Sequence, residues 1–146
     1  AQTEIISEAG VTYPISAIFT STDASFDNTF SSSFWGDVNA GMDIPDLPDS
    51  QLAIRGGFRT NSGFSGDATL YAYGNTCSVA NCSSGTEIDS YRIVDMSLSK
   101  QINKSLDVYM IVENIFNEED IIARAPKNGA RAQKPRTTVF GLRLKI

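Results

Sequence analysis

The stretch RTTVFGLRLKI, residues 136–146, alternates strictly between two kinds of side chain. In a β-strand, successive side chains point to opposite faces. One face then carries the apolar residues and one threonine: Thr138, Phe140, Leu142, Leu144 and Ile146. The other face carries Val139, Gly141, Arg143 and Lys145. Such a strand either buries its apolar face in a soluble core or presents it to lipid, and alternation alone does not decide between the two.

Five further segments show the same period of two, with apolar residues on one face and polar residues on the other. The segments are 10–26, 51–59, 64–74, 91–100 and 105–116. In the last of them, for example, Leu106 and Val108 alternate with Asp107 and Tyr109. This pattern predicts β-strands. We therefore expect an all-β chain, an antiparallel meander of about six strands.

The connections between these segments alternate in length. Residues 60–63 and 102–105 form short turns that contain Asn and Ser, which tolerate turn geometry. The other connections are long polar segments, 27–48, 74–90 and 117–135. An antiparallel meander of this kind has all its short turns at one end, as transmembrane β-barrels do. A soluble β-sandwich that acts as an extracellular binding or adhesion module is the alternative that the pattern leaves open.

The composition argues against several classes of protein. The chain of 146 residues has a net charge of −5, which argues against a nucleic-acid partner. It contains no histidine, so neither a Ser-His-Asp nor a Cys-His catalytic site can form. With two cysteines and no histidine, it also lacks the ligands of a zinc site. We therefore expect no enzymatic activity, no cofactor and no bound metal.

The two cysteines lie in a polar stretch, GNTCSVANCSSGTE. Cys77 and Cys82 suit a disulfide in a small exposed loop, and disulfides persist in oxidising compartments. A pair of unlinked surface thiols is the alternative. We expect the disulfide in the connection between the strands near 64–74 and 91–100, on the extracellular side with the other long connections.

Four stretches of the chain carry a family resemblance: 13–30, 34–54, 89–100 and 112–146. They contain a Thr-Asp-Ala-x-Phe element, a G-x-x-x-P-x-x-P segment, an aspartate in the antepenultimate strand, a V-x-N-[LI]-F-[DN] element and a loop rich in Arg and Pro. These elements are Thr22–Phe26, Gly41–Pro48, Asp95, Val112–Asn117 and Arg124–Arg136. In this order they resemble the C-terminal barrel region of TonB-dependent outer-membrane receptors, in particular the ferric-dicitrate-like branch.

The resemblance implies a fold and a function. Residues 1–146 would form the C-terminal fragment of a receptor β-barrel, with about six transmembrane strands and without the plug domain. The chain would lie in the bacterial outer membrane and take part in the uptake of a ferric chelate (a siderophore or iron citrate) or a similar nutrient. Its expected partners are outer-membrane lipid, the plug and N-terminal strands of the receptor, and the TonB system through that plug.

Two of these elements also have a physical interpretation. Asn114 and Asn117 stand where a strand ends, and Asn side chains bond local backbone groups as a strand gives way to a loop. Pro45 and Pro48 precede the strand that starts near Gln51, where a missing backbone N–H does least harm to the hydrogen-bond ladder.

The loop before the last strand is the candidate ligand-binding site. Five cations lie within thirteen residues: Arg124, Lys127, Arg131, Lys134 and Arg136. Guanidinium groups pair with carboxylates through two parallel hydrogen bonds, and an anionic chelate such as iron citrate presents carboxylates. We expect four of the cations to contact such a ligand: Arg124, Lys127, Arg131 and Arg136. The alternative is that they engage outer-leaflet phosphates or acidic neighbours such as Glu118 and Asp120.

Overall fold

The computed structural model describes residues 2–6, 10–82, 84–124 and 129–145. The predicted ligand contact of Lys127 and the predicted place of Ile146 on the apolar face therefore lie outside the described residues. Every helix or strand element in these ranges is a β-strand. Within the same ranges, no helix is long and apolar enough to cross a membrane. The prediction of an all-β chain is therefore confirmed.

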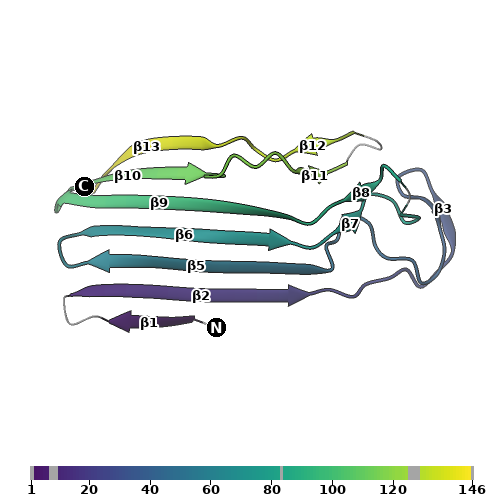
Figure 1. Ribbon diagram of the computed structural model, residues 1–146, viewed down its shortest axis with the longest axis horizontal. Helices are drawn as coiled ribbons and strands as arrows, with labels where there is room; N and C mark the ends of the chain where they lie inside the picture. Colours follow the sequence, from purple (N-terminus) through teal and green to yellow (C-terminus); the bar gives the residue numbers. More distant parts are fainter. Residues whose placement is uncertain (1, 7–9, 83, 125–128, 146) are drawn as a thin grey trace.

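Seven strands form one sheet in which each strand pairs antiparallel with the next one along the order β1-β2-β5-β6-β9-β10-β13 (Figure 1). The strands are β1 Gln2–Ile6, β2 Val11–Ser21, β5 Ser50–Thr60, β6 Phe64–Tyr73, β9 Tyr91–Asn103, β10 Leu106–Glu113 and β13 Thr137–Leu144. The last six are the six predicted strands, and β1 is an additional strand that the alternation did not predict. The sheet is open, with β1 and β13 at its two edges.

The connections follow the predicted alternation in length. The short turns lie at one end of the sheet and the long connections at the other (Figure 1). At the turn after β5, the Gly63 N–H donates to the Thr60 carbonyl at 3.0 Å. Gly63 has a φ of 78°, a conformation that glycine adopts without strain. β5 begins at Ser50, two residues after Pro48 and close to its predicted start.

Each long connection contains a two-stranded ribbon of its own, which the sequence did not predict. The ribbons are β3 Phe30–Ser32 with β4 Gly36–Val38, β7 Thr76–Cys77 with β8 Glu87–Ile88, and β11 Ile121–Ala123 with β12 Arg131–Ala132. Below, the first connection is residues 22–49, the second is 74–90 and the third is 114–136. These segments are thus folded structures rather than simple polar loops.

The register of the sheet joins the predicted apolar faces of the strands into one surface. Ala17 is opposite Ile54, Ile54 is opposite Leu70, and Leu70 is opposite Val94. A second row on the same face connects residues nearer the short turns: Phe140, Met110, Leu98, Gly66 and Phe58. Because side chains alternate with a period of two, these matches place all the apolar faces on the same side of the sheet.

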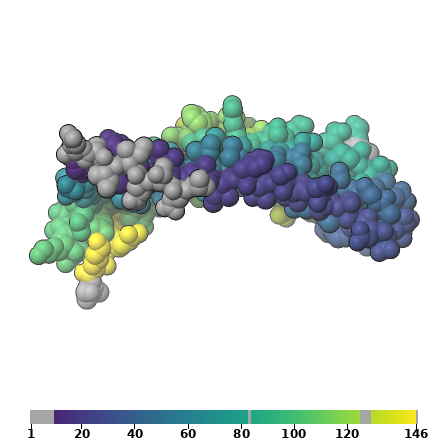
Figure 2. All heavy atoms as spheres, turned by 90° about the horizontal axis from the view of Figure 1, so that it is seen from below, coloured from purple at the N-terminus to yellow at the C-terminus, as the bar shows by residue number. Residues whose placement is uncertain are grey.

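Nothing within the described residues covers this apolar face. Phe140, Leu142 and Leu144 of β13 are 75%, 70% and 72% exposed. Figure 2 shows the molecule as a thin, bent layer. A β-sandwich needs a second sheet packed about 10 Å away, whereas the described strands form one seven-stranded sheet and three two-stranded ribbons in the connections. The alternative prediction of a soluble sandwich is therefore not supported by the fold.

The opposite face of the sheet is polar, and its side chains bond one another across strands. Arg55 forms an ion pair with Asp67, and Asp67 also accepts a hydrogen bond from the Ser97 hydroxyl at 3.2 Å. The hydroxyls of Ser65 and Ser99 lie 2.8 Å apart. This face therefore has the chemistry of a polar lumen surface.

Candidate functional site

The three long connections pack against one another and contain most of the buried apolar side chains. Among the described residues, four hydrophobic side chains are buried: Val38, Ala80, Ile88 and Val112. The first three of these belong to the first and second connections. Because the sheet itself is a single layer, the connections hold the small core of this chain.

Hydrogen bonds join the connections to one another. The Asp46 N–H of the first connection donates to the Cys77 carbonyl of the second at 2.8 Å. The Ala80 N–H of the second connection donates to the Trp35 carbonyl of the first at 3.4 Å. The second and third connections meet where Arg124 Nε donates to the Glu87 carbonyl at 2.7 Å. The connections thus form a single folded layer at one end of the sheet.

A disulfide links Cys77 to Cys82, with their Cα atoms 5.5 Å apart. It lies in the second connection, between β6 and β9, where the sequence predicted it. The carbonyl of Cys77 is the acceptor for Asp46, so the disulfide ring is attached to the first connection as well. The disulfide therefore braces the contact between two connections.

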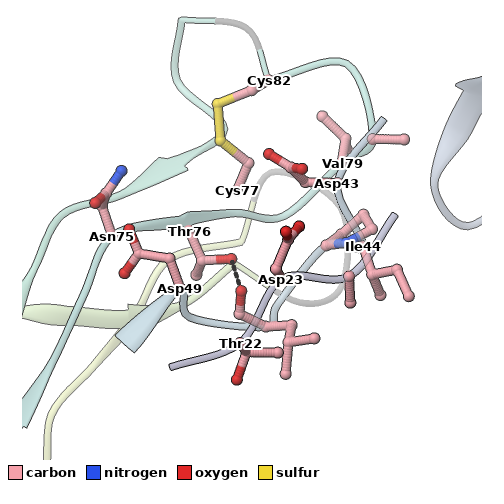
Figure 3. Close-up of a pocket in the computed structure, with 14 residues that line it drawn as sticks. Thr22, Asp23, Asp43, Ile44, Asp49, Asn75, Thr76, Cys77, Val79 and Cys82 are labelled. Atoms are coloured by element: carbon pink, nitrogen blue, oxygen red, sulfur yellow. Dashed lines mark hydrogen bonds between the residues drawn. A yellow bond between two sulfur atoms is a disulfide. The ribbon is translucent and has the colours of Figure 1, made fainter. Parts of the chain in front are cut away.

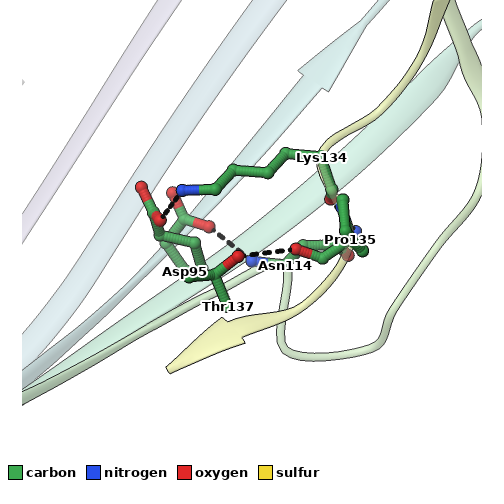
Figure 4. Close-up of polar contacts among 6 residues, drawn as sticks. Asp95, Asn114, Lys134, Pro135 and Thr137 are labelled. Atoms are coloured by element: carbon green, nitrogen blue, oxygen red, sulfur yellow. Dashed lines mark hydrogen bonds and ion pairs between the residues drawn. The ribbon is translucent and has the colours of Figure 1, made fainter. Parts of the chain in front are cut away.

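Asn114 organises the base of the third connection (Figure 4). Asn114 is only 2% exposed, and its backbone φ is 51°. Asn114 Nδ2 donates to the Glu118 and Lys134 carbonyls at 2.9 and 2.8 Å, while Oδ1 accepts the Glu118 N–H at 3.0 Å. The Asn114 N–H donates to Asp95 Oδ1 on β9 at 2.9 Å. One side chain thus ties both ends of the third connection together.

Asn117 is more exposed than Asn114, and its side chain also bonds the backbone. Its φ is 55°, and its Oδ1 accepts the Arg136 N–H at 3.0 Å. The prediction of bonds to local backbone groups is confirmed for Asn114, which bonds the backbone of Glu118, whereas the backbone partner of Asn117 is nineteen residues away. The partners of Asn114 include Lys134, which is twenty residues away in the sequence.

The predicted ligand-binding cations are not gathered around one point. Arg124 donates to the Glu87 carbonyl, and Arg136 Nη1 donates to the Ile115 carbonyl at 3.4 Å. Arg131 is exposed on β12, and its side chain forms no hydrogen bond or ion pair with another described residue. Lys134, the fifth cation of the loop, forms an ion pair with Glu113 (Figure 4). Several of these cations therefore also hold the third connection in place.

A cavity of about 340 Å³ lies between the first and second connections (Figure 3). Three carboxylates line it, those of Asp23, Asp43 and Asp49. The disulfide forms part of one wall, and apolar side chains such as Ile44 complete it. The sequence did not predict this cavity, because its walls come from segments that are far apart in the chain.

An aromatic cluster lies in the first connection, around the β3–β4 ribbon. The ring of Phe26 lies 5.5 Å from the rings of both Phe30 and Trp35, and the ring of Phe34 lies 5.8 Å from that of Trp35. Phe30 and Phe34 are 40% and 60% exposed. The signal that could have identified this region is compositional, since four aromatic residues stand within ten positions.

No protein-family model matches the chain. No curated protein matches it either.

Solved structures do match. The chain is similar to the ferric-catecholate import receptor Fiu of E. coli K12 in its closed form, with 18% identity and a TM-score of 0.71 over 95% of this chain and 19% of that chain. It is similar to the siderophore receptor PiuA of Acinetobacter baumannii, with 15% identity and a TM-score of 0.78 over 98% of this chain and 20% of that chain. A mutant of the ferric enterobactin receptor PfeA of Pseudomonas aeruginosa gives 15% identity and a TM-score of 0.65 over 98% and 21%.

The chain thus spans about a fifth of the length of these receptors. At this level of identity, the likeness establishes the fold: almost the whole chain has the fold of part of these receptors.

Proposed function

We propose that this chain is the C-terminal part of the β-barrel of a TonB-dependent outer-membrane receptor that takes up a ferric chelate or a similar nutrient. The observation that carries the proposal is the single-layer sheet, which has one continuous apolar face and one polar face, with all long connections at one end. The likeness to siderophore receptors over 95–98% of the chain supports it. This role is transport rather than catalysis.

In this proposal, the apolar face contacts outer-membrane lipid and the polar face lines the barrel lumen. Transmembrane barrels alternate apolar residues outward with polar residues inward, and the exposed side chains of β13 fit the lipid side. Open sheet edges are not stable in a membrane, because unpaired backbone groups have no water to bond. The edges β1 and β13 therefore pair with further strands of the same receptor, which also supplies the plug and, through it, the link to TonB.

The third connection is the proposed contact for the anionic part of a chelate. The Arg124 Nε donates to the Glu87 carbonyl, which fixes the guanidinium, and its terminal nitrogens have no hydrogen-bond partner among the described residues and can bind a carboxylate. Arg131 is exposed on the same connection. Lys127 and Arg136 remain in the predicted set, although Arg136 also bonds the Ile115 carbonyl.

A pair of substitutions on β13 tests the membrane assignment. Phe140 is opposite Met110, which is opposite Leu98 near the middle of β9, so Phe140 stands near mid-height of the sheet. Its replacement by arginine on a lipid face costs about 2–4 kcal/mol at the bilayer midplane. We expect Phe140→Arg to remove the intact receptor from the outer-membrane fraction, and the neighbouring Val139→Arg on the polar face to leave it there.

The measurement is the amount of folded receptor in isolated outer membranes, together with iron uptake under iron limitation. Equal tolerance of the two arginines would show that the apolar face does not contact lipid. The sequence of the complete coding region provides a second test, because the assignment of residues 1–146 to part of a barrel requires that a plug and further strands be encoded upstream.

A further inference from the structure

The aromatic cluster of the first connection leaves ring surfaces open to solvent. Phe30 and Phe34 are well exposed, and each contacts a half-buried ring, Phe26 or Trp35 respectively. Contiguous exposed apolar side chains on a protein surface mark an interaction site more often than scattered ones do. Because the face of an aromatic ring carries negative potential, the cluster attracts cations as well as apolar groups.

The first connection is also negatively charged, which likewise favours the binding of cations. Between residues 22 and 49 there are six aspartates and no Lys, Arg or Glu. The aspartates are Asp23, Asp27, Asp37, Asp43, Asp46 and Asp49. Among the described residues, none of them forms an ion pair with a Lys or Arg. Surface carboxylates alone are ordinarily solvated, but the same connection also carries the exposed rings, and both features favour a positive charge.

One pair of hydrogen-bonded segments connects the cavity to the ring cluster. The segment that contains Ala24 and Phe26 pairs with the segment of Met42 and Ile44: the Phe26 N–H donates to the Met42 carbonyl at 2.9 Å and the Ile44 N–H to the Ala24 carbonyl at 3.1 Å. Ala24 and Ile44 line the cavity, and Phe26 belongs to the ring cluster. The volume of about 340 Å³ suits the end group of a small molecule. Phe26 of the ring cluster and the cavity residues Asp23 and Asp43 thus belong to one short pair of segments, although no ring among the described residues lines the cavity itself.

We propose that the first connection binds the ammonium arm of a cationic ferric chelate, so that the receptor prefers such a chelate to a polyanionic one. This inference rests on the proposed transport function and adds the class of ligand. The ring faces and the carboxylates attract an ammonium group, and the same negative potential repels a polyanion such as ferric citrate. The described cations of the third connection do not line the cavity, although Arg124 donates to the carbonyl of Glu87, which pairs with the cavity residue Cys77. They remain available to an anionic part of the same ligand.

Two probes that differ by one charge test the proposal on the intact receptor. Ferrioxamine B is a ferric tris-hydroxamate with a free terminal ammonium, and its N-acetyl derivative is the same chelate without that charge. Calorimetric titration of the purified receptor should show the ammonium form binding about tenfold more tightly, as expected for a partly desolvated cation on rings and carboxylates. Ferric citrate and ferric enterobactin serve as polyanionic comparisons.

Three variants localise the effect. Asp43→Asn removes one cavity carboxylate and Phe34→Ala removes one exposed ring, and each should reduce the preference for the ammonium form to about a third. Glu119→Gln makes the same change in net charge as Asp43→Asn at an exposed position of the third connection, and should leave the preference unchanged. All three positions are exposed, so the variants should reach the membrane in normal amounts.

The outcomes separate this inference from the proposed function. Equal affinity for the two hydroxamate chelates, tighter binding of the polyanions, or the same loss of preference in Glu119→Gln would overturn the inference and leave ferric-chelate uptake standing. Failure to bind any of the four chelates would overturn the ferric-chelate part of the proposed function and this inference with it.

Discussion

Replacing Asn114 by alanine tests how the third connection is held at its base. Asn114 is only 2% exposed, and its side chain makes three hydrogen bonds: it donates to two carbonyls and accepts one bond from the Glu118 N–H. Their loss costs about 3 kcal/mol, at roughly 1 kcal/mol for each bond. The positive φ of 51° adds about 1 kcal/mol, because alanine avoids the left-handed region that asparagine tolerates.

The expected result is local opening of the third connection without loss of the barrel. A cost of about 4 kcal/mol corresponds to amide exchange that is faster by about 10²- to 10³-fold. The Gln133 amide, which donates to the Asp120 carbonyl at 2.9 Å, is a suitable reporter. Hydrogen–deuterium exchange of the intact receptor, read by mass spectrometry on peptides from this connection, measures the change.

Asn117→Ala is the matched control. Asn117 also has a positive φ, but it is exposed and its side chain accepts one hydrogen bond, from the Arg136 N–H. We expect a loss of about 1–2 kcal/mol and exchange faster by about tenfold. If Asn114→Ala exchanges within threefold of the native protein, or if both variants respond equally, Asn114 does not hold the connection in the way described.

Three further predictions concern other parts of the chain. Replacing Cys77 and Cys82 together by serine should lower the unfolding free energy by at most about 2–3 kcal/mol, because the closed ring is short; limited proteolysis should cut the second connection faster, and unchanged cleavage would contradict its bracing role. A Cβ at Gly141 would lie 2.2 Å from the Tyr109 ring, so Gly141→Val should displace that ring and lower stability by about 1–3 kcal/mol, which an unchanged unfolding temperature would disprove. Burial raises the pKa of Asp46 above its ordinary 3.8, so its contribution to stability is present below pH 3.8 and is lost as the pH rises through the raised pKa. Asp46→Asn should remove this pH dependence from the protection of the amide that donates to the Cys77 carbonyl, and persistence of the dependence would refute the assignment.

The sequence by itself determined the strands and their faces. Alternation depends only on the pleat of a single strand, so the apolar set Phe140, Leu142 and Leu144 could be assigned before any pairing was known. The disulfide and the bonds between Asn114 and Glu118 were also local enough to predict, since each joins residues within a few positions, whereas the bond from Asn114 to the Lys134 carbonyl spans twenty residues. β1 escaped prediction because its five residues, QTEII, are too short to show a clear alternation.

Only the tertiary structure decided how these local features combine. Register fixed that six apolar faces join into one surface, because pairing between strands depends on contacts between segments that are far apart in the chain. The partners of the predicted cations also depend on contacts between distant segments. Arg124 donates to the Glu87 carbonyl of the second connection, thirty-seven residues away, and the spacing of residues within its own loop cannot predict this contact. The cavity beside Asp23 and Asp43 exists only because two connections pack together. Of its walls, the sequence predicted only the disulfide between Cys77 and Cys82.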